Sequence, residues 1–456
     1  MSELHKFVRL VLSPFLLITL LSAAVANDEG QERRFEPNSS IKPGGLTSVP
    51  QTGPYAEQIK DNLKKIRLPK GFKIELYAVV PDTRYIAASL TANMVFVGTR
   101  RTTVWAISDR NGNMFADEVK PFAPKFRFKN PNGVCLTNDG SLIVVETNRV
   151  LSFPAAQLMS EKSEATVITV VPEGGLIPVE EQSPNHSGRT CKVSDDGKLY
   201  ITLGQPYNVQ PKEKIDLYNK IGIGGVISLN SSNGSGKEVY AIGMRNPAGM
   251  DINPRDKTIW TTDNQVDGLG DDEPPGELNR ITKAGQHFGF PYWNGAYKVA
   301  GSPVAPDLKD IQEPVSAIFP QVEFPAHQAQ LGMSFYTGKQ FPQKYQGGVF
   351  VAAHGSWNRT VPSGYLINFV PINTDGTAGK AEVFADGFID FMSEGSRGNS
   401  DDGAKPMANL AMESDFASTF FRIYGRPVDV ANLPDGSILV SDDFANALYR
   451  ISYTGD

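Results

Sequence analysis

The sequence is short of cysteine, of basic charge and of long apolar segments. It has two cysteines, Cys135 and Cys191, and no Cys-x-x-Cys-His motif, so it encodes no covalently attached haem. Its 44 basic and 50 acidic residues give a net charge of −6, which argues against a nucleic-acid partner because such a partner needs a basic surface. An oxidising compartment would permit one disulfide, and the alternative is two buried thiols.

Only the N-terminus carries a substantial apolar run. Lys6 and Arg9 precede apolar residues 10–21, and small residues follow up to Ala26. This order predicts a secretory signal over residues 1–26, cleaved after Ala26. An uncleaved anchor is the alternative, but the run is too short to favour it. No later segment is apolar enough to span a bilayer, so we expect a secreted or periplasmic protein with no membrane span in the mature chain.

The rest of the chain divides into two parts. Residues 27–65 are polar and are expected to be a poorly ordered lead-in. Residues 66–456 are expected to form one folded domain, because one pattern recurs along them. In each copy a turn, often Asp-Gly, leads into a short apolar strand, and a second strand follows. The six copies are residues 92–109, 138–155, 195–207 with 224–230, 255–264 with 277–285, 347–358 with 364–372, and 434–453.

Six copies of a two-strand pattern, without helical periodicity, predict an all-β fold, a six-bladed β-propeller with long insertions. The early segment 72–80, FKIELYAVV, is expected to complete the last blade and close the ring. The alternative is one or two β-sandwiches, which the shared internal order of the copies disfavours. In a propeller, the loops that flank the inner strands form one face, where a ligand usually binds.

Arginines stand beside the strands of the later copies. Arg245-Asn246 and Arg426 directly precede prolines that begin strands, and Arg359 follows a strand together with Trp357. An arginine keeps its charge, so three arginines converging on one face would need a multiply charged anion, and Arg359 with Trp357 would stack on a flat one. The alternative for Arg359 and Trp357 is a surface turn.

His186 is the candidate proton acceptor. It stands with Arg189 just upstream of a strand in the third copy, and an imidazole can accept a proton near neutral pH. The alternative is a loop histidine that caps backbone groups.

An acidic segment lies in the fourth copy between residues 263 and 277. Oxygen ligands at this density, with glycines that free backbone carbonyls, suit Ca²⁺. The candidate ligands are Gly270, Asp271, Asp272 and Glu277. The alternative is a set of solvated turn acids. Residues 109–117 form a second, weaker calcium-like loop, whose glycine is out of place for an EF-hand.

Five segments, in order, resemble the soluble quinoprotein glucose/sorbosone dehydrogenases, and the resemblance spans roughly residues 66–456. They are AIGMRNPAGMDINP, GDDEPPGELNRI, GQHFGFPYW, HGSWNRT and YGRPVDVANLPDGSILVSDD. The resemblance implies a propeller that binds pyrroloquinoline quinone (PQQ) and Ca²⁺ and oxidises sugars.

By the same resemblance, His186 matches the general base. Arg245 and Asn246 match residues that contact the quinone oxygens, and Arg426 matches an arginine that binds a cofactor carboxylate. Arg359 lies where the family places a basic residue. The resemblance implies a small sugar as substrate and an electron acceptor that the sequence does not identify.

The sequence departs from the best-known glucose enzymes at two places. Asn185 stands where they have an aspartate before the histidine, and the turn at residues 268–271 replaces a Gly-Pro turn whose carbonyls hold Ca²⁺. The chain is therefore closer to the sorbosone or aldose branch. Two other functions stay open at this point: a calcium-dependent lactonase or related hydrolase, and a propeller that only binds a ligand. The arginines disfavour the hydrolase, because its site needs no large polyanion.

Overall fold

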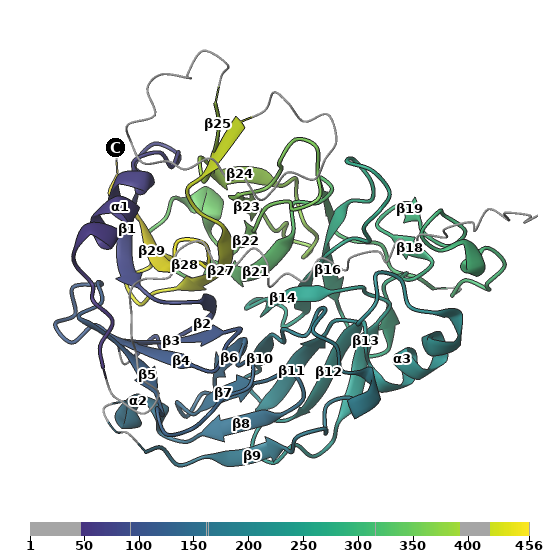
Figure 1. Cartoon of the computed structure of the whole chain (residues 1–456), viewed down its shortest axis with the longest axis horizontal. Helices are drawn as coiled ribbons and strands as arrows, with labels where there is room; N and C mark the ends of the chain where they lie inside the picture. Colours follow the sequence, from purple (N-terminus) through teal and green to yellow (C-terminus); the bar gives the residue numbers. More distant parts are fainter. Residues whose placement is uncertain are drawn as a thin grey trace, which may run out of the picture.

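The structure is a computed structural model that describes residues 47–91, 93–160, 162, 164–314, 316–392 and 420–455. It forms a six-bladed β-propeller, as the sequence predicts (Figure 1). Each blade is an antiparallel sheet of four strands, and the third blade has a short fifth strand that pairs in parallel. The expected secretory signal, residues 1–26, lies outside the described residues.

The first three blades follow one another along the chain. Blade 1 contains β2 (Thr83–Ala88), β3 (Met94–Thr99), β4 (Val104–Ser108) and β5 (Glu118–Phe122). Blade 2 contains β6 (Gly133–Leu136), β7 (Leu142–Val145), β8 (Val150–Phe153) and β9 (Ile168–Val171). Blade 3 contains β10 (Cys191–Val193), β11 (Lys198–Leu203), β12 (Gly225–Asn230), β13 (Glu238–Ile242) and β17 (Gln286–His287).

The last three blades repeat this order. Blade 4 contains β14 (Pro247–Ile252), β15 (Ile259–Asp263), β16 (Gly276–Ile281) and β20 (Val322–Phe324). Blade 5 contains β21 (Gln330–Phe335), β22 (Val349–Ala353), β23 (Leu366–Val370) and β24 (Glu382–Ala385). Blade 6 contains β27 (Pro427–Asn432), β28 (Ile438–Asp442), β29 (Ala447–Tyr453) and β1 (Phe72–Val79).

Helices, 3-10 turns and two-stranded sheets lie outside the six blade sheets. The helices are α1 (Pro54–Leu63), α2 (Ala156–Met159) and α3 (Ile215–Ile221), with single 3-10 turns at Val179–Glu181, Lys212–Lys214, Pro306–Leu308 and Gln343–Tyr345. Two extra hairpins pair β18 (Trp293–Asn294) with β19 (Tyr297–Lys298), and β25 (Ile389–Met392) with β26 (Phe420–Ile423).

Asp-Gly turns join the first and second strands in three blades. In blade 2, Asp139 accepts the backbone N–H of Ser141 at 3.1 Å, and Gly140 has φ +81°. In blade 6, Asp435 accepts the N–H of Ser437 at 3.0 Å, and Gly436 has φ +87°. Aspartate supplies the side-chain acceptor and glycine the left-handed backbone, which explains why this dipeptide recurs in the sequence.

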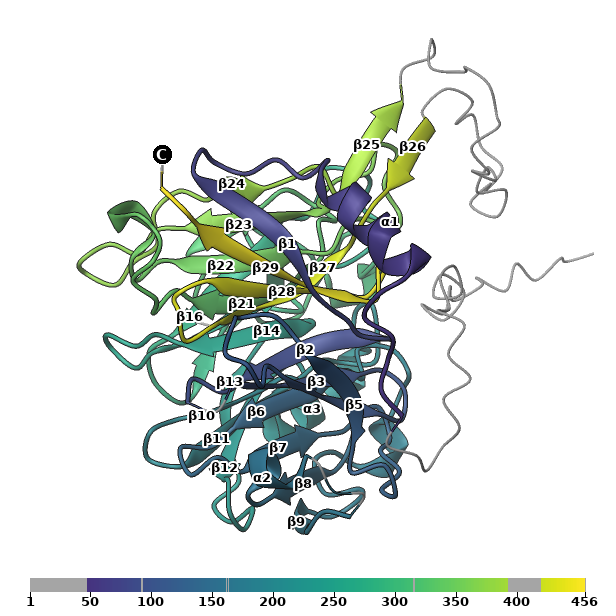
Figure 2. The ribbon, with the colours of Figure 1, turned by 90° about the vertical axis from the view of Figure 1, so that its left-hand side faces the viewer.

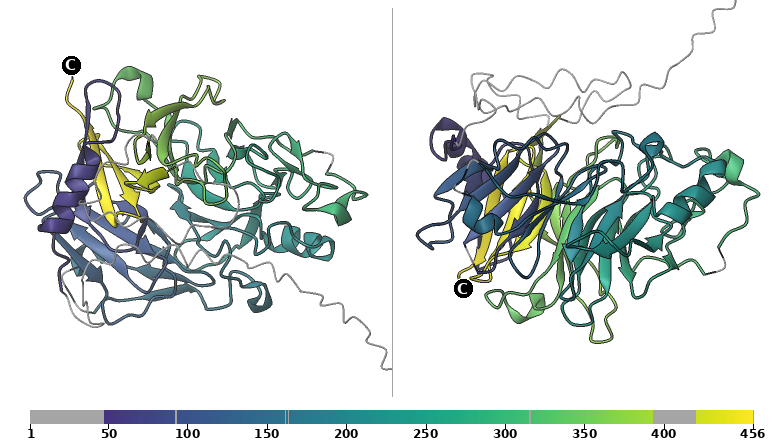
Figure 3. Two further views of the ribbon diagram at one scale, coloured as in Figure 1. Left: turned by 45° about the horizontal axis from the view of Figure 1, so that its top comes forward. Right: turned by 90° about the horizontal axis from the view of Figure 1, so that it is seen from below.

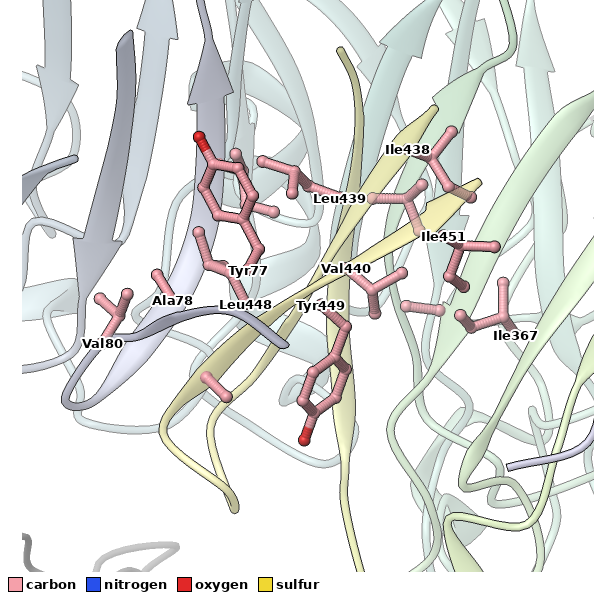
Figure 4. Packing of buried hydrophobic residues seen from close by; sticks show 14 of the residues in the cluster. Tyr77, Ala78, Val80, Ile367, Ile438, Leu439, Val440, Leu448, Tyr449 and Ile451 are labelled. Carbon is pink, nitrogen blue, oxygen red and sulfur yellow. The ribbon is translucent and has the colours of Figure 1, made fainter. Parts of the chain in front are cut away.

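The ring closes where the two ends of the propeller domain meet. β1 pairs antiparallel with β29, with Phe72 opposite Tyr453, so the segment 72–80 completes blade 6 as predicted. Figure 3 shows β1, in purple, beside the yellow strands of that blade. Tyr77 and Ala78 of β1 pack among buried residues of β28 and β29 (Figure 4). Removing this apolar surface from water stabilises the closure.

A disulfide joins blades 2 and 3. Cys135 in β6 is bonded to Cys191 in β10, with the two Cα atoms 5.9 Å apart and a sequence separation of 56. Both residues are buried. The sequence left a disulfide and two thiols open, and the structure contains the disulfide.

The part of the lead-in that the structure describes is more ordered than the sequence predicts. Residues 54–63 form α1, with Pro54 in its first turn and Ile59 and Leu63 buried against blade 6. The hydroxyl of Tyr55 donates to the carbonyl of Ala445 at 2.7 Å. The expectation of an irregular segment up to residue 65 is therefore wrong over α1, because these apolar residues share one helical face.

The β25–β26 hairpin projects from the propeller on the side where α1 lies (Figure 2). Within the described ranges, no helix is long and apolar enough to cross a membrane.

The first strand of each blade lies nearest the centre of the ring (Figure 1). Because it runs antiparallel to the second strand, its start lies beside the second strand's end. Pro247 accordingly pairs with Asp263, and Pro427 with Asp442. We call this end of the propeller the mouth. It comprises residues 81–84, 130–132, 184–190, 204–214, 243–247, 263–275, 325–330, 354–365, 424–427 and 442–446.

Candidate active site

The predicted catalytic and cofactor residues all lie at the mouth, on segments from blades 3 to 6. They are His186, Arg245, Asn246, Trp357, Arg359 and Arg426. Two sets of contacts organise these segments, one around Arg245 and one around Arg426, whereas Arg359 contacts the acidic segment.

His186 is held in a fixed orientation. Its backbone is left-handed, with φ +49°, and its Nδ1 lies 2.6 Å from the carbonyl oxygen of Gln205. A carbonyl only accepts hydrogen bonds, so the neutral ring carries its proton on Nδ1 and its lone pair on Nε2. Asn185, the residue before it, is exposed. The arrangement therefore provides a proton acceptor at Nε2.

Gly204 brings His186 and Asn246 together. A Cβ added at Gly204 would lie 2.6 Å from Oδ1 of Asn246 and 2.7 Å from Cβ of His186. Gln205, the next residue, donates its backbone N–H to the carbonyl of Arg245 at 3.1 Å. Gly204 and Gln205 were not predicted from the sequence, although a glycine directly after an apolar strand indicates that another group approaches the backbone closely.

The guanidinium of Arg245 is buried and fully oriented. Its Nη2 donates to Oδ2 of Asp267 and to Oδ1 of Asn208, both at 2.8 Å, and its Nε donates to the carbonyl of Asn208 at 2.9 Å. The residue is 4% exposed. Asp267 also accepts from Nδ2 of Asn358 at 2.9 Å, so one carboxylate joins the segment before β14 of blade 4 to the loop after β22 of blade 5.

The backbone of Arg245 and Asn246 is held by Asp263. Its carboxylate accepts the N–H of Arg245 at 2.9 Å and that of Asn246 at 2.6 Å. Burial and the neighbouring Glu277 raise the pKa of Asp263 well above its usual value. In blade 6, Asp442 accepts the N–H of Arg426 at 2.9 Å, and burial raises the pKa of Asp442 to about 6.

Arg426 contacts the loop that follows β22. Its Nε donates to the carbonyl of His354 at 3.2 Å and its Nη2 to that of Gly355 at 2.9 Å. The imidazole of His354 in turn contacts Asp443, with Nε2 2.8 Å from Oδ1. Burial lowers the pKa of His354 to about 4, so the ring is neutral at pH 7 and donates from Nε2.

Asp443 also binds Arg84 of blade 1 through Oδ2. Burial alone would raise the pKa of Asp443, but His354 and Arg84 hold it well below its usual range. Arg84 was not predicted from the sequence, although it is the second residue of an inner strand, close to the positions that Arg245 and Arg426 have before theirs.

Arg359 and Trp357 lie on the same loop, residues 354–360, but differ in what they contact. Nη1 of Arg359 donates to the carbonyl of Asp271 at 2.9 Å, and Nη2 to the exposed carboxylate of Asp272 at 2.8 Å. Trp357 is 53% exposed. The structure thus places Arg359 on the acidic segment, while the loop that carries it also contacts Arg426 and, through Asp267, Arg245.

The predicted calcium ligands do not form one carboxylate cluster. Glu277 lies in β16, is 1% exposed, and accepts from Asn279 and Asn294 at 2.7 Å each. Asp271 instead accepts the N–H of Thr360 at 3.1 Å, and the carbonyl of Gly270 contacts Nε2 of His327 at 2.7 Å. Among the described residues, no three His, Cys, Asp or Glu side chains are placed to hold a metal ion together. Calcium binding by these residues stays a prediction.

The second acidic loop is closed by its own side chains. Asp109 is buried and accepts the backbone N–H groups of Gly112 at 2.8 Å, Asn113 at 3.1 Å and Met114 at 2.8 Å. Its oxygens are therefore already used by the loop backbone.

Several side-chain amides at the mouth are buried without a hydrogen-bond partner in the described structure. Both amide atoms of Gln205 are of this kind, as are the oxygens of Asn264, Gln265 and Asn358. Leaving such a group unsatisfied costs roughly 1–3 kcal/mol. Amide oxygens are ligands that Ca²⁺ accepts, and the Gln205 amide suits a polar organic molecule. These residues fit a site that holds both a hard cation and a polar ligand.

The family model for glucose / sorbosone dehydrogenase matches residues 148–358, which include His186, Arg245 and the acidic segment. An uncharacterized protein of Borreliella burgdorferi is 30% identical over 405 residues, which cover 87% of this chain and 93% of that protein. The chain belongs to the glucose/sorbosone dehydrogenase family. Another relative, the aldose sugar dehydrogenase YliI of Escherichia coli, is 27% identical over 179 residues, covering 37% of this chain and 45% of the relative.

Solved structures share the family fold. The holo PQQ domain of a pyranose dehydrogenase from Coprinopsis cinerea aligns with a TM-score of 0.63 at 18% identity, covering 85% of this chain and 97% of that domain. The apo form of the soluble aldose sugar dehydrogenase of Escherichia coli aligns with a TM-score of 0.52 at 16% identity, covering 84% and 99%. The fold of this glucose/sorbosone dehydrogenase family member is thus the propeller that these solved sugar dehydrogenase structures also have.

Proposed function

We propose that this protein is a PQQ- and calcium-dependent sugar dehydrogenase that oxidises an aldose or a sorbosone-like aldehyde sugar. The observation that carries the proposal is the meeting of His186 with Asn246 across Gly204, where a Cβ would lie 2.6 Å from Oδ1 of Asn246 and 2.7 Å from Cβ of His186. Arg245, the residue before Asn246, carries a buried cation, so the segment that meets the oriented imidazole also supplies a positive charge, and both groups serve an oxidation of C–O–H to C=O.

The residues assigned to the cofactor are Arg245, Asn246, Arg426, Trp357 and Arg359. Arg245 and Asn246 are held by Asp263, and Arg426 by Asp442, so their positions are preorganised. Calcium is assigned to Gly270, Asp271, Asp272 and Glu277, with the unpartnered amide oxygens of Asn264 and Gln265 as further oxygen donors. When bound, PQQ with Ca²⁺ supplies the acceptor for the hydride that leaves the sugar carbon.

His186 has the role of general base. Its Nδ1–H donates to the carbonyl of Gln205, and we assign to Nε2, the ring nitrogen with the lone pair in this tautomer, the proton of the sugar hydroxyl. Arg245 has a fixed positive charge in a buried position, which stabilises negative charge developing on a nearby oxygen. Asp267 and Asn208 hold this guanidinium, so little reorganisation is needed when the charge develops.

The remaining assignments concern location and partners. The N-terminal signal pattern supports export to the periplasm or the exterior, where the disulfide is stable. We assign a small sugar as substrate and leave the electron acceptor as a separate redox partner.

The test is reconstitution of the purified protein in four arms: no addition, PQQ alone, Ca²⁺ alone, and both. Each arm is assayed for dye-linked oxidation of a panel of aldoses, and in parallel for hydrolysis of a sugar lactone. We expect dye reduction only with both additions and no lactone hydrolysis. Lactone hydrolysis that needs Ca²⁺ but not PQQ would replace the dehydrogenase proposal with a hydrolase.

A further inference from the structure

Arg84 of blade 1 reaches across the start of its own inner strand to both neighbouring blades. Its Nη1 binds Oδ2 of Asp443, which follows β28 of blade 6. Its Nε lies 3.4 Å from Oδ1 of Asn132, the residue before β6 of blade 2. The next residue, Tyr85, donates its hydroxyl to the carbonyl of Ala248 in blade 4. Arg84 therefore lies at the mouth, where blades 6, 1 and 2 meet.

The guanidinium of Arg84 is largely buried yet retains bonding capacity. The side chain is 12% exposed. Within the described ranges, its Nη2 has no hydrogen-bond partner, whereas Nε and Nη1 are both used. Asp443 is shared, because its other oxygen binds His354, whose carbonyl accepts from Arg426. One continuous chain of contacts thus runs from Arg84 to Arg426.

We propose that Arg84 is a further anion-binding residue of the site, whose Nη2 edge binds a carboxylate of the ligand beside Arg426. The inference rests on the proposed function, since it assigns to the ligand a carboxylate that faces blade 1. A planar guanidinium held on one edge by Asp443 presents its other edge in a fixed direction, which suits a carboxylate better than a lysine ammonium would.

A purely structural role predicts a different outcome from the same residues. If Arg84 only neutralises Asp443, then substituting either residue of the pair has the same effect on ligand binding. If Arg84 binds the ligand directly, its removal weakens binding. Removing the charge of Asp443 instead leaves the guanidinium in place with less competition for it. Comparing ligand binding by a variant of Arg84 with binding by a variant of Asp443 therefore distinguishes the structural role from direct ligand binding.

The experiment measures the dissociation constant of the purified apo protein by equilibrium dialysis with Ca²⁺ present. The probes are PQQ and, as a simpler flat tricarboxylate, benzene-1,3,5-tricarboxylate. The variants are Arg84→Gln, Arg84→Lys and Asp443→Asn. The matched control is Arg67→Gln, because Arg67 also pairs with an aspartate, Asp386, but its side chain is 72% exposed. Circular dichroism and thermal unfolding establish that each variant is folded.

We expect Arg84→Gln to weaken binding about tenfold to a hundredfold, the range of a lost hydrogen bond to a charged group. Arg84→Lys should recover part of that loss, Asp443→Asn should weaken binding less than Arg84→Gln does because the guanidinium stays, and Arg67→Gln should bind as tightly as the wild type. An unchanged constant in Arg84→Gln overturns the inference, as does equal weakening in Arg84→Gln and Asp443→Asn. If the wild type binds the tricarboxylate through Arg84 but not PQQ, the proposed function fails and the inference stands. If it binds neither, both fail.

Discussion

Asp263 and Asp442 lie in equivalent positions of blades 4 and 6, each opposite the proline that begins the inner strand. Each accepts, at 2.9 Å, the backbone N–H of the arginine that precedes that strand. Asp263 also accepts the N–H of Asn246. The two blades therefore share one device, in which a buried carboxylate fixes the backbone of a site arginine.

Asp263→Ala should release this backbone. Two buried N–H groups would lose their acceptor, at a cost of roughly 1–3 kcal/mol each, offset in part by removing a carboxylate that burial disfavours. We expect a lower free energy of unfolding in urea and weaker PQQ binding. Asp307→Ala, at an exposed aspartate of blade 4's insertion, is the control and should change neither quantity. Unaltered PQQ binding in a folded Asp263→Ala would show that Arg245 and Asn246 do not need this support.

His186→Ala should lower the turnover of the reconstituted enzyme by about 10²–10⁴, the scale of a lost general base, while PQQ binding stays nearly intact. His186→Gln should be similarly poor, because an amide can hydrogen-bond but cannot accept the proton. The measurement is a pH–rate profile with saturating PQQ, Ca²⁺ and sugar, beside a PQQ titration. Turnover near the wild-type value across the profile would make His186 a loop residue and move the base elsewhere.

The fold could be predicted from the sequence because the strands and turns of the propeller each have a short, local sequence pattern. The Asp-Gly turns, the paired apolar strands and the segment 72–80 each depend on neighbours close in sequence or on a strand's own pattern. Helix α1 was missed because its buried face is short, with a polar surface on all other sides.

The site was predicted less completely, because its contacts join distant residues. The Asp267 contact with Arg245 bridges 22 residues, and that of Arg84 with Asp443 bridges 359. No local pattern records such a pair. Glu277 shows the converse: it lies beside acidic residues in sequence, but the β16 strand turns its side chain into the protein, away from the exposed Asp272.

The disulfide should contribute measurably to stability. A double variant, Cys135→Ala with Cys191→Ala, opens a loop with a sequence separation of 56 residues. We expect it to lose about 2–4 kcal/mol, because the unfolded chain gains conformational freedom. The measurement is urea unfolding of both proteins, with the wild type also tested after reduction. If the free energy of unfolding of the wild type does not change on reduction and equals that of the double variant, the prediction is wrong.

Asp429 should make stability depend on pH. Burial raises its pKa from 3.8 to about 7, against the attraction of Lys192. The folded protein therefore holds this proton more tightly than the unfolded chain does. Its contribution is fully present below about pH 4 and is lost as the pH rises to about 7, at up to about 1.4 kcal/mol per pH unit. Asp429→Asn should flatten this part of the curve of unfolding free energy against pH. Parallel curves for the two proteins from pH 4 to 7 would contradict the assignment.

The central proposal is that this glucose/sorbosone dehydrogenase family member would pass a sugar's hydride to bound PQQ, with His186 taking the proton. It is tested most directly by mixing the PQQ- and Ca²⁺-loaded protein with one equivalent of an aldose that the dye-linked panel identifies as a substrate, without oxygen or dye, and following the cofactor spectrum. The account predicts a single reduction step that is several-fold slower when the sugar carries deuterium at the oxidised carbon, and much slower still in His186→Ala. A cofactor spectrum that does not change with any aldose of the panel, although PQQ is bound, would contradict it.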